Sequence, residues 1–353
     1  MTDDWRVVVH QRGSVVLDGT VVCDGFMPSC GVRVQSHAHS DHMTEFNASL
    51  GIGDVVCLQG TRDLIVADEW PLGEHSNFRA LEEGVPFPVK ESDDLGNEVV
   101  CGELTLFGSN HMLGSAQSVF VNQDGIRTGY SGDFGWPIEP IEVDQIVIDG
   151  TSSPTAIRDY TQEEAEDCFV NLVHESLFEK SVVVSADLES MYRAIRALSQ
   201  LSDIPVLIDK RGARYAAVYE EYGVEIPTIF ERTDSRIGKE IANTEKCVFI
   251  RTKGGTFNYE KGKILISLIP FYNRPHQPIF ESRPGISWQV GMTNHADFLE
   301  TLLYVEQCGA SHILVDNARG KNAAALVEAF RDRFGNRKVS CEIKVCDGTY
   351  GGT

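Results

Sequence analysis

The run His37-Ala38-His39-Ser40-Asp41-His42 places four metal-ligand side chains within six residues. Imidazoles and carboxylates are the donors that zinc and similar borderline cations accept. In an extended stretch, residues two apart point to the same side, so His37 and His39 can reach one ion together. Asp41 and His42 follow at once, placed to reach a second ion beside the first. The run therefore predicts a metal centre.

Length and composition limit the class of protein. The 353 residues, 42% of them hydrophobic, indicate one large domain with an insertion or two domains. Nine cysteines without a CxxC pair favour reduced thiols and a cytoplasmic location. We expect neither a signal peptide nor a membrane span, because no apolar stretch approaches the ~18–20 residues that a span needs. The sequence contains no GxSxG elbow and no P-loop, so a serine hydrolase or a P-loop nucleotide hydrolase has no support from its motifs.

The charge balance is acidic, with a formal net charge of −21. Such a surface repels phosphates, which argues against a nucleic-acid partner. The charge is unevenly distributed, however, because residues 158–285 hold 17 of the 31 Lys and Arg residues and only 20 of the 52 Asp and Glu residues. This middle segment is nearly neutral, and it is where contacts to a nucleic-acid backbone are expected.

The order of predicted elements divides the chain. Short β-branched runs separated by Gly and Asp predict a β-rich first part. After about residue 155, helices and strands alternate, which is the rhythm of a parallel sheet with crossover helices. The end alternates again, with strands expected at Ser287–Val290 and His312–Val315 and a helix at Asp297–Gln307.

Four further polar positions share one feature, since each follows a predicted strand. These strands are Leu104–Phe107, Ile126–Tyr130, Gln145–Ile148 and Ser287–Val290, and the residues that follow them are His111, Asp133, Asp149 and His295. Strand ends that face one way around a sandwich can converge on one site. Flanking glycines let the backbone approach ions and substrate closely. We therefore expect these four side chains to join the histidine run.

These motifs resemble those of metallo-β-lactamase-fold nucleases of the β-CASP branch, such as the exonucleases of mRNA 3′-end processing and the cleavage and polyadenylation factor. His37–His42 resembles the HxHxDH signature, His111 the next histidine motif, and Asp133 the bridging aspartate. Asp149 and His295, in His-Ala-Asp, resemble the two motifs that distinguish the nuclease branch.

The resemblance implies an α/β protein: a metallo-β-lactamase αββα sandwich with an inserted β-CASP-type α/β domain. We expect the sandwich at 1–157 and 286–353 and the insertion at 158–285. Two zinc ions per chain are implied. One would be held by His37, His39 and His111, the other by Asp41, His42 and Asp316, with Asp133 bridging them. Asp316 is a departure, because many RNA-cutting relatives have a histidine after this strand.

The resemblance also implies the catalytic residues, which are Asp41, Asp149 and His295. Asp149 would accept an imidazole N–H and so fix its tautomer. His295 would protonate the leaving oxygen. Candidate contacts to the substrate backbone lie in the insertion, at Lys210, Arg211, Arg214, Arg274 and His276.

The function predicted is a zinc-dependent phosphodiesterase that cleaves nucleic acid by attack of a metal-activated hydroxide, with single-stranded RNA favoured and DNA second. Alternatives are a DNA exonuclease of the same fold, a metallo-hydrolase of small esters or thioesters, and a non-catalytic RNA-binding subunit. The sequence leaves open exonuclease or endonuclease action and whether the chain forms a homodimer.

Overall fold

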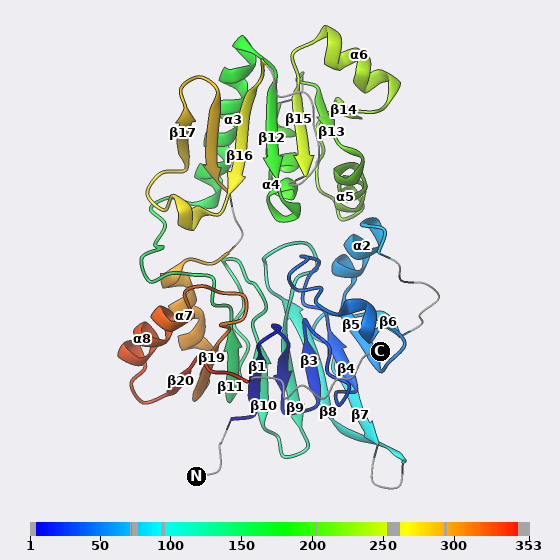
Figure 1. Cartoon of the computed structure of the whole chain (residues 1–353), viewed down its shortest axis with the longest axis vertical. Coiled ribbons are helices and arrows are strands. Elements are labelled where there is room, and N and C mark those ends of the chain that lie inside the picture. The colour runs from blue at the N-terminus through cyan, green and yellow to red at the C-terminus, as the bar shows by residue number, and fades with distance from the viewer. Residues whose placement is uncertain are drawn as a thin grey trace. The chain divides into compact units, whose positions relative to one another are not determined.

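The computed structural model describes residues 5–70, 72, 77–92, 96–201, 203–252, 262–292 and 295–344. The chain forms two compact units, one made of 1–155 with 295–353 and the other of 156–294 (Figure 1). The first unit therefore resumes at residue 295, whereas the return segment was expected to begin at 286. The reason is that β18 (Ser287–Gly291) pairs with β16 (Ile264–Ile269) and extends the sheet of the second unit.

Two seven-stranded sheets form the first unit. The first sheet has the strand order β21 (Ile343–Lys344), β1 (Val7–His10), β2 (Val15–Leu17), β3 (Val21–Cys23), β4 (Val32–Val34), β5 (Asp54–Leu58), β6 (Phe78–Leu81). The second has the order β20 (Lys338–Ser340), β19 (His312–Val315), β11 (Gln145–Ile148), β10 (Arg127–Tyr130), β9 (Ala116–Asn122), β8 (Glu98–Gly108), β7 (Phe87–Ser92). Continuous buried runs such as those of β11 and β19 form central strands because apolar side chains cover both of their faces.

Three hydrophobic clusters give this unit four layers. One cluster joins the two sheets, with Leu17 and Val34 from the first packed with Leu106 and Phe120 from the second. A second cluster packs α7 (Phe298–Cys308) and α8 (Ala323–Arg333) on the outer face of the second sheet. A third packs α1 (Phe46–Ser49) and α2 (Gln59–Ala67) on the outer face of the first. Burial of apolar area between layers is the main favourable term in their stability.

Strand direction explains why the polar residues meet. In the second sheet β10, β11 and β19 are parallel. Strand β8 runs the same way, because it and β10 are both antiparallel to β9. Strands β3 and β4 of the first sheet are also parallel. The carboxyl ends of parallel strands lie at one edge of a sheet, so the loops after them share an edge in each sheet.

The second unit contains one mixed, mainly parallel sheet with the order β14 (Phe230–Arg232), β13 (Val206–Ile208), β15 (Val248–Thr252), β12 (Val182–Ala186), β16, β18, β17 (Ile279–Arg283). Its helices are α3 (Gln162–Glu179), α4 (Leu188–Leu198), α5 (Lys210–Glu221) and α6 (Arg236–Thr244), and a 3₁₀ turn, η1, spans Phe271–Asn273. Capping boxes at Thr161–Glu164 and Asp187–Ser190 start α3 and α4.

The whole chain is thus of the mixed α/β class. None of the described helices combines the length and the apolar composition that crossing a bilayer requires.

Candidate metal centre

The loop that carries the histidine run follows strand β4 and is held by two buried polar side chains, Arg33 and Gln35. The amide of Gln35 donates to the backbone carbonyls of His37 (2.7 Å) and His42 (3.1 Å). The guanidinium of Arg33 donates to the carbonyl of Thr44 at 2.9 Å and to Gln35 at 2.8 Å. Because the loop closes around these donors, its histidines are held in a fixed conformation.

The loop that carries His111 is held just as tightly. Oγ of Ser115 accepts from the backbone N–H groups of His111 (3.1 Å) and Met112 (3.0 Å). Gly114, at φ +72, lies against α2, where a Cβ atom would come within 2.1 Å of the Thr61 nitrogen. Only glycine permits this approach.

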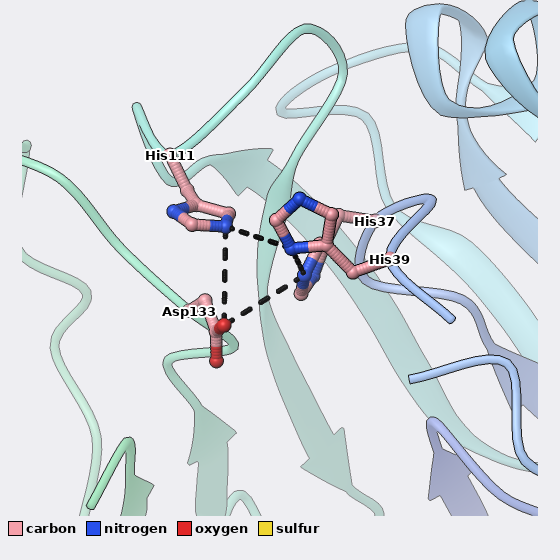
Figure 2. Close-up of side chains that lie close together, drawn as sticks. All are labelled: His37, His39, His111 and Asp133. Atoms are coloured by element: carbon pink, nitrogen blue, oxygen red, sulfur yellow. Dashed lines mark hydrogen bonds and ion pairs between the residues drawn. The ribbon is translucent and has the colours of Figure 1, made fainter. Parts of the chain in front are cut away.

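Three histidines and one carboxylate meet at one point of the first unit (Figure 2). Nδ1 of His39 lies 3.1 Å from Nε2 of His37 and 3.3 Å from Nε2 of His111. Oδ2 of Asp133 lies 3.8 Å from each of the last two nitrogens. Four donors held tetrahedrally at the usual zinc bond lengths are about 3.3 Å apart. Both the spacing and the chemistry of the donors fit a tetrahedral cation, and we call this group of four donors the first metal position.

The protonation states suit a cation as well. Burial, reinforced by neighbouring histidines, holds the pKa of His37 and of His111 well below its usual range. Burial alone would raise the pKa of Asp133, but the adjacent His42 holds it well below its usual range. Two neutral rings and an ionised carboxylate are the forms that bind metal.

Asp133 also faces a second group. Its Oδ1 atom lies 3.3 Å from Nε2 of His42, and Oδ2 of the exposed Asp41 lies 3.9 Å from the same nitrogen. The two oxygens of Asp133 thus face different histidines, as the bridging assignment requires.

Asp316 was expected to be a ligand of the second ion, but its carboxylate is paired with other groups. Neither Asp316 nor Asp41 belongs to a group of three or more described residues whose donor atoms all lie within 4.8 Å of one another. The carboxylate of Asp316 instead accepts from Nη1 of Arg319 at 3.0 Å and from the N–H of Ala318 at 2.8 Å. The second metal position, expected at Asp41, His42, Asp133 and Asp316, therefore lacks Asp316 as a donor.

The sequence analysis missed Asp24, which follows β3 and is fully buried. Its Oδ2 atom accepts from Nδ1 of His42 (2.7 Å), from Oγ of Ser36 (2.6 Å) and from the Tyr130 hydroxyl (3.1 Å). Since the Ser36 hydroxyl donates to Asp24, it can only accept from Nδ1 of His37, 2.9 Å away. Asp24 thus orients both rings. It fixes the tautomer of His37, whose Nε2 lone pair faces the site, and it holds the Nδ1–H of His42, so that Nε2 of His42 faces Asp133.

His42 lies between two carboxylates, which favour its protonated form. Burial alone would raise the pKa of Asp24 and lower that of His42. The attraction between the two groups lowers the pKa of Asp24, and Asp133 together with Asp24 raises that of His42 to about 10.

Asp149 and His295 form a pair beside the first group. Nδ1 of His295 donates to Oδ2 of Asp149 at 3.2 Å, and its Nε2 lies 3.8 Å from Oδ2 of Asp133. The next residue fixes the backbone, because Ala296 donates to the carbonyl of Phe134 at 2.8 Å and accepts from Ser152 at 2.6 Å. Asp297 then caps α7 through a capping box with Glu300.

The five candidate substrate contacts all belong to the second unit. Lys210 and Arg211 are exposed at the start of α5, and Arg211 donates to the Tyr215 hydroxyl at 2.8 Å. Arg214 lies one turn further along this helix. The Arg274 guanidinium lies 3.8 Å from the centre of the Phe280 ring. His276 pairs with Asp159 at 2.8 Å. Their contact with a substrate stays a prediction.

No family model matches the chain. A protein of Acidianus ambivalens, named "Uncharacterized protein in lig 3'region", is 27% identical over 128 residues, which make up 35% of this chain and 90% of the relative.

Proposed function

We propose that this chain is a zinc-dependent phosphodiesterase that cleaves nucleic acid, with RNA favoured over DNA. The proposed fold is the metallo-β-lactamase αββα sandwich, and the second unit is its β-CASP-type insertion. One observation carries the proposal: His37, His39, His111 and Asp133 converge beside the hydrogen-bonded pair Asp149–His295.

The three histidines and Asp133 would hold the ion. When bound, zinc supplies positive charge next to a scissile phosphate and lowers the pKa of a water toward neutrality. Residues of the chain orient the side chains that would hold the ion. Asp24 and Ser36 orient the ring of His37, and Asp133 presents its second oxygen to His42.

His295 is suited to act as the general acid. Its Nδ1–H is held by Asp149, so its Nε2 atom is the one turned toward Asp133 and the histidine group. The Asp149 carboxylate stabilises the protonated ring, which can then give the Nε2 proton to the leaving oxygen. Such a transfer typically contributes about 10²–10⁴-fold to the rate. A hydrolase of small, activated esters has less need of it, which favours a nucleotide leaving group.

The test compares polymers of one sequence. Purified protein is incubated with end-labelled single-stranded RNA, with the matching DNA and with a small thioester, with zinc and after chelation. We expect zinc-dependent cleavage of RNA, slower cleavage of DNA and little thioester hydrolysis. His295→Gln should suppress strand cleavage. His174→Gln, on the exposed side of α3, is the matched control. Cleavage of neither polymer with any metal, or thioester hydrolysis alone, would refute the proposal.

A further inference from the structure

Arg319 is a buried cation attached to three acceptors of the first unit. Its side chain is only 9% exposed. Nη1 donates to Oδ2 of Asp316 at 3.0 Å, Nη2 to the carbonyl of Asp24 at 2.9 Å, and Nε to the carbonyl of Asp41 at 3.3 Å. The guanidinium thus joins the loops after β3, β4 and β19. Planar guanidinium groups with this many fixed acceptors keep their charge and geometry.

The surrounding backbone leaves room for this side chain. A Cβ atom on Gly13 would lie 2.8 Å from Nη2 and 2.9 Å from Cζ of Arg319. At the end of β11, a Cβ atom on Gly150 would lie 2.1 Å from the carbonyl oxygen of Asp316, and Gly320 packs directly on Gly150. These close contacts fix the turn from Asp316 to Gly320, so the Asp316–Arg319 pair is a built feature of the fold.

Asp316 has no carboxylate oxygen left without an N–H donor. Oδ1 accepts from the N–H of Ala318 and Oδ2 from Arg319, and the residue is 2% exposed. A metal ion bound by Asp316 would have to share this carboxylate with the positively charged Arg319 in a buried place, which is costly.

We propose that Arg319 occupies the electrostatic place of a second divalent cation and holds Asp316 away from metal, so that the chain retains one ion. This inference rests on the proposed function only in assuming that the first position binds zinc. It replaces the expectation of two ions per chain.

The experiment counts metal rather than turnover. Wild-type protein is loaded with excess zinc, desalted thoroughly and analysed by inductively coupled plasma mass spectrometry. We expect one zinc per chain, and the same in Asp316→Asn. Two per chain in the wild type would overturn the inference and leave the proposed function intact. No retained zinc would overturn both.

A second measurement isolates Arg319. In Arg319→Met the Asp316 carboxylate loses its partner, and we expect a second equivalent of Co²⁺ to bind about 10-fold or more tightly than to the wild type. Arg319→Lys keeps the positive charge and should bind no second Co²⁺ ion. If the methionine variant does not fold, a second Co²⁺ ion bound by the lysine variant would contradict the proposal. Arg333→Met is the control, because Arg333 forms an exposed pair with Glu306 on the same unit. Unchanged Co²⁺ binding in a folded Arg319→Met protein would contradict the proposal.

Discussion

Nδ1 of His42 donates a hydrogen bond of 2.7 Å to Oδ2 of Asp24, a fully buried residue 18 positions earlier in the chain. The same carboxylate reaches His37 through Ser36. One residue therefore orients two histidines that face the two oxygens of Asp133. Mutation of a residue that hydrogen-bonds to a metal ligand commonly lowers metal affinity by about 10–100-fold. Asp24 is therefore as informative a target for mutation as the ligands themselves.

Replacement of Asp24 by Asn should lower zinc affinity by about 10–100-fold. The amide cannot accept from Ser36 and His42 with the same geometry, while Asn tolerates the left-handed backbone at this position, where φ is 52°. Competition against a chromophoric chelator measures the change. Asp54→Asn, which breaks a pair with Arg79 on the same sheet, is the control. Equal zinc affinity in the two variants would show that Asp24 does not orient the ligands.

Sequence periodicity was sufficient to find most of the site. His37, His39, His111, Asp133, Asp149 and His295 all follow strands that the apolar runs predict, and the structure brings them together. Asp24 follows Val21–Cys23 in the same way and could have been found by the same rule. It was missed because a lone aspartate before glycine is also typical of a turn.

Two features could not be predicted from the sequence. The partner of Asp316 is Arg319, three residues later, and nothing in the local pattern distinguishes a paired aspartate from a metal ligand. The return to the first unit was predicted too early. The composition of strand β18 suits a sheet of either unit. Only its pairing with β16 and β17 assigns it to the sheet of the second unit.

Zinc should stabilise the protein in proportion to the logarithm of its concentration above the dissociation constant, because the ion binds the folded chain. At 100 times that constant the gain is about 2.7 kcal/mol. Differential scanning fluorimetry with and without a chelator should show a higher Tm with zinc. His39→Gln removes one donor and should abolish the shift, whereas His174→Gln should keep it. A Tm that does not respond to zinc in the wild type would count against the first metal position.

Loss of the general acid should depend on the leaving group. Both His295→Gln and Asp149→Asn should keep their zinc, since neither side chain belongs to the group of four donors. Turnover of a nucleotide phosphodiester should fall by about 10²–10⁴-fold in His295→Gln, and less in Asp149→Asn. A p-nitrophenyl phosphodiester, whose leaving group needs no proton, should be affected far less. Equal losses on both substrates would mean that His295 only maintains the structure.

The position of Arg319 can be tested through the glycine beside it. Gly13 and Gly19 both have left-handed φ values, +84° and +74°, so alanine strains the backbone at each, by about 1–2 kcal/mol. They differ in their surroundings, because a Cβ atom at Gly19 meets nothing within 4 Å, whereas at Gly13 it would press on the Arg319 guanidinium. Urea denaturation should therefore show a larger loss of unfolding free energy in Gly13→Ala than in Gly19→Ala.

The difference between these two losses measures the contact with Arg319. It should disappear in the Arg319→Met background, where a flexible, uncharged side chain can move aside, so the double variant should lose only what Gly19→Ala loses. If Gly13→Ala and Gly19→Ala are equally destabilised in the wild-type background, the guanidinium is not held against this turn, and the fixed cation beside Asp316 is not supported.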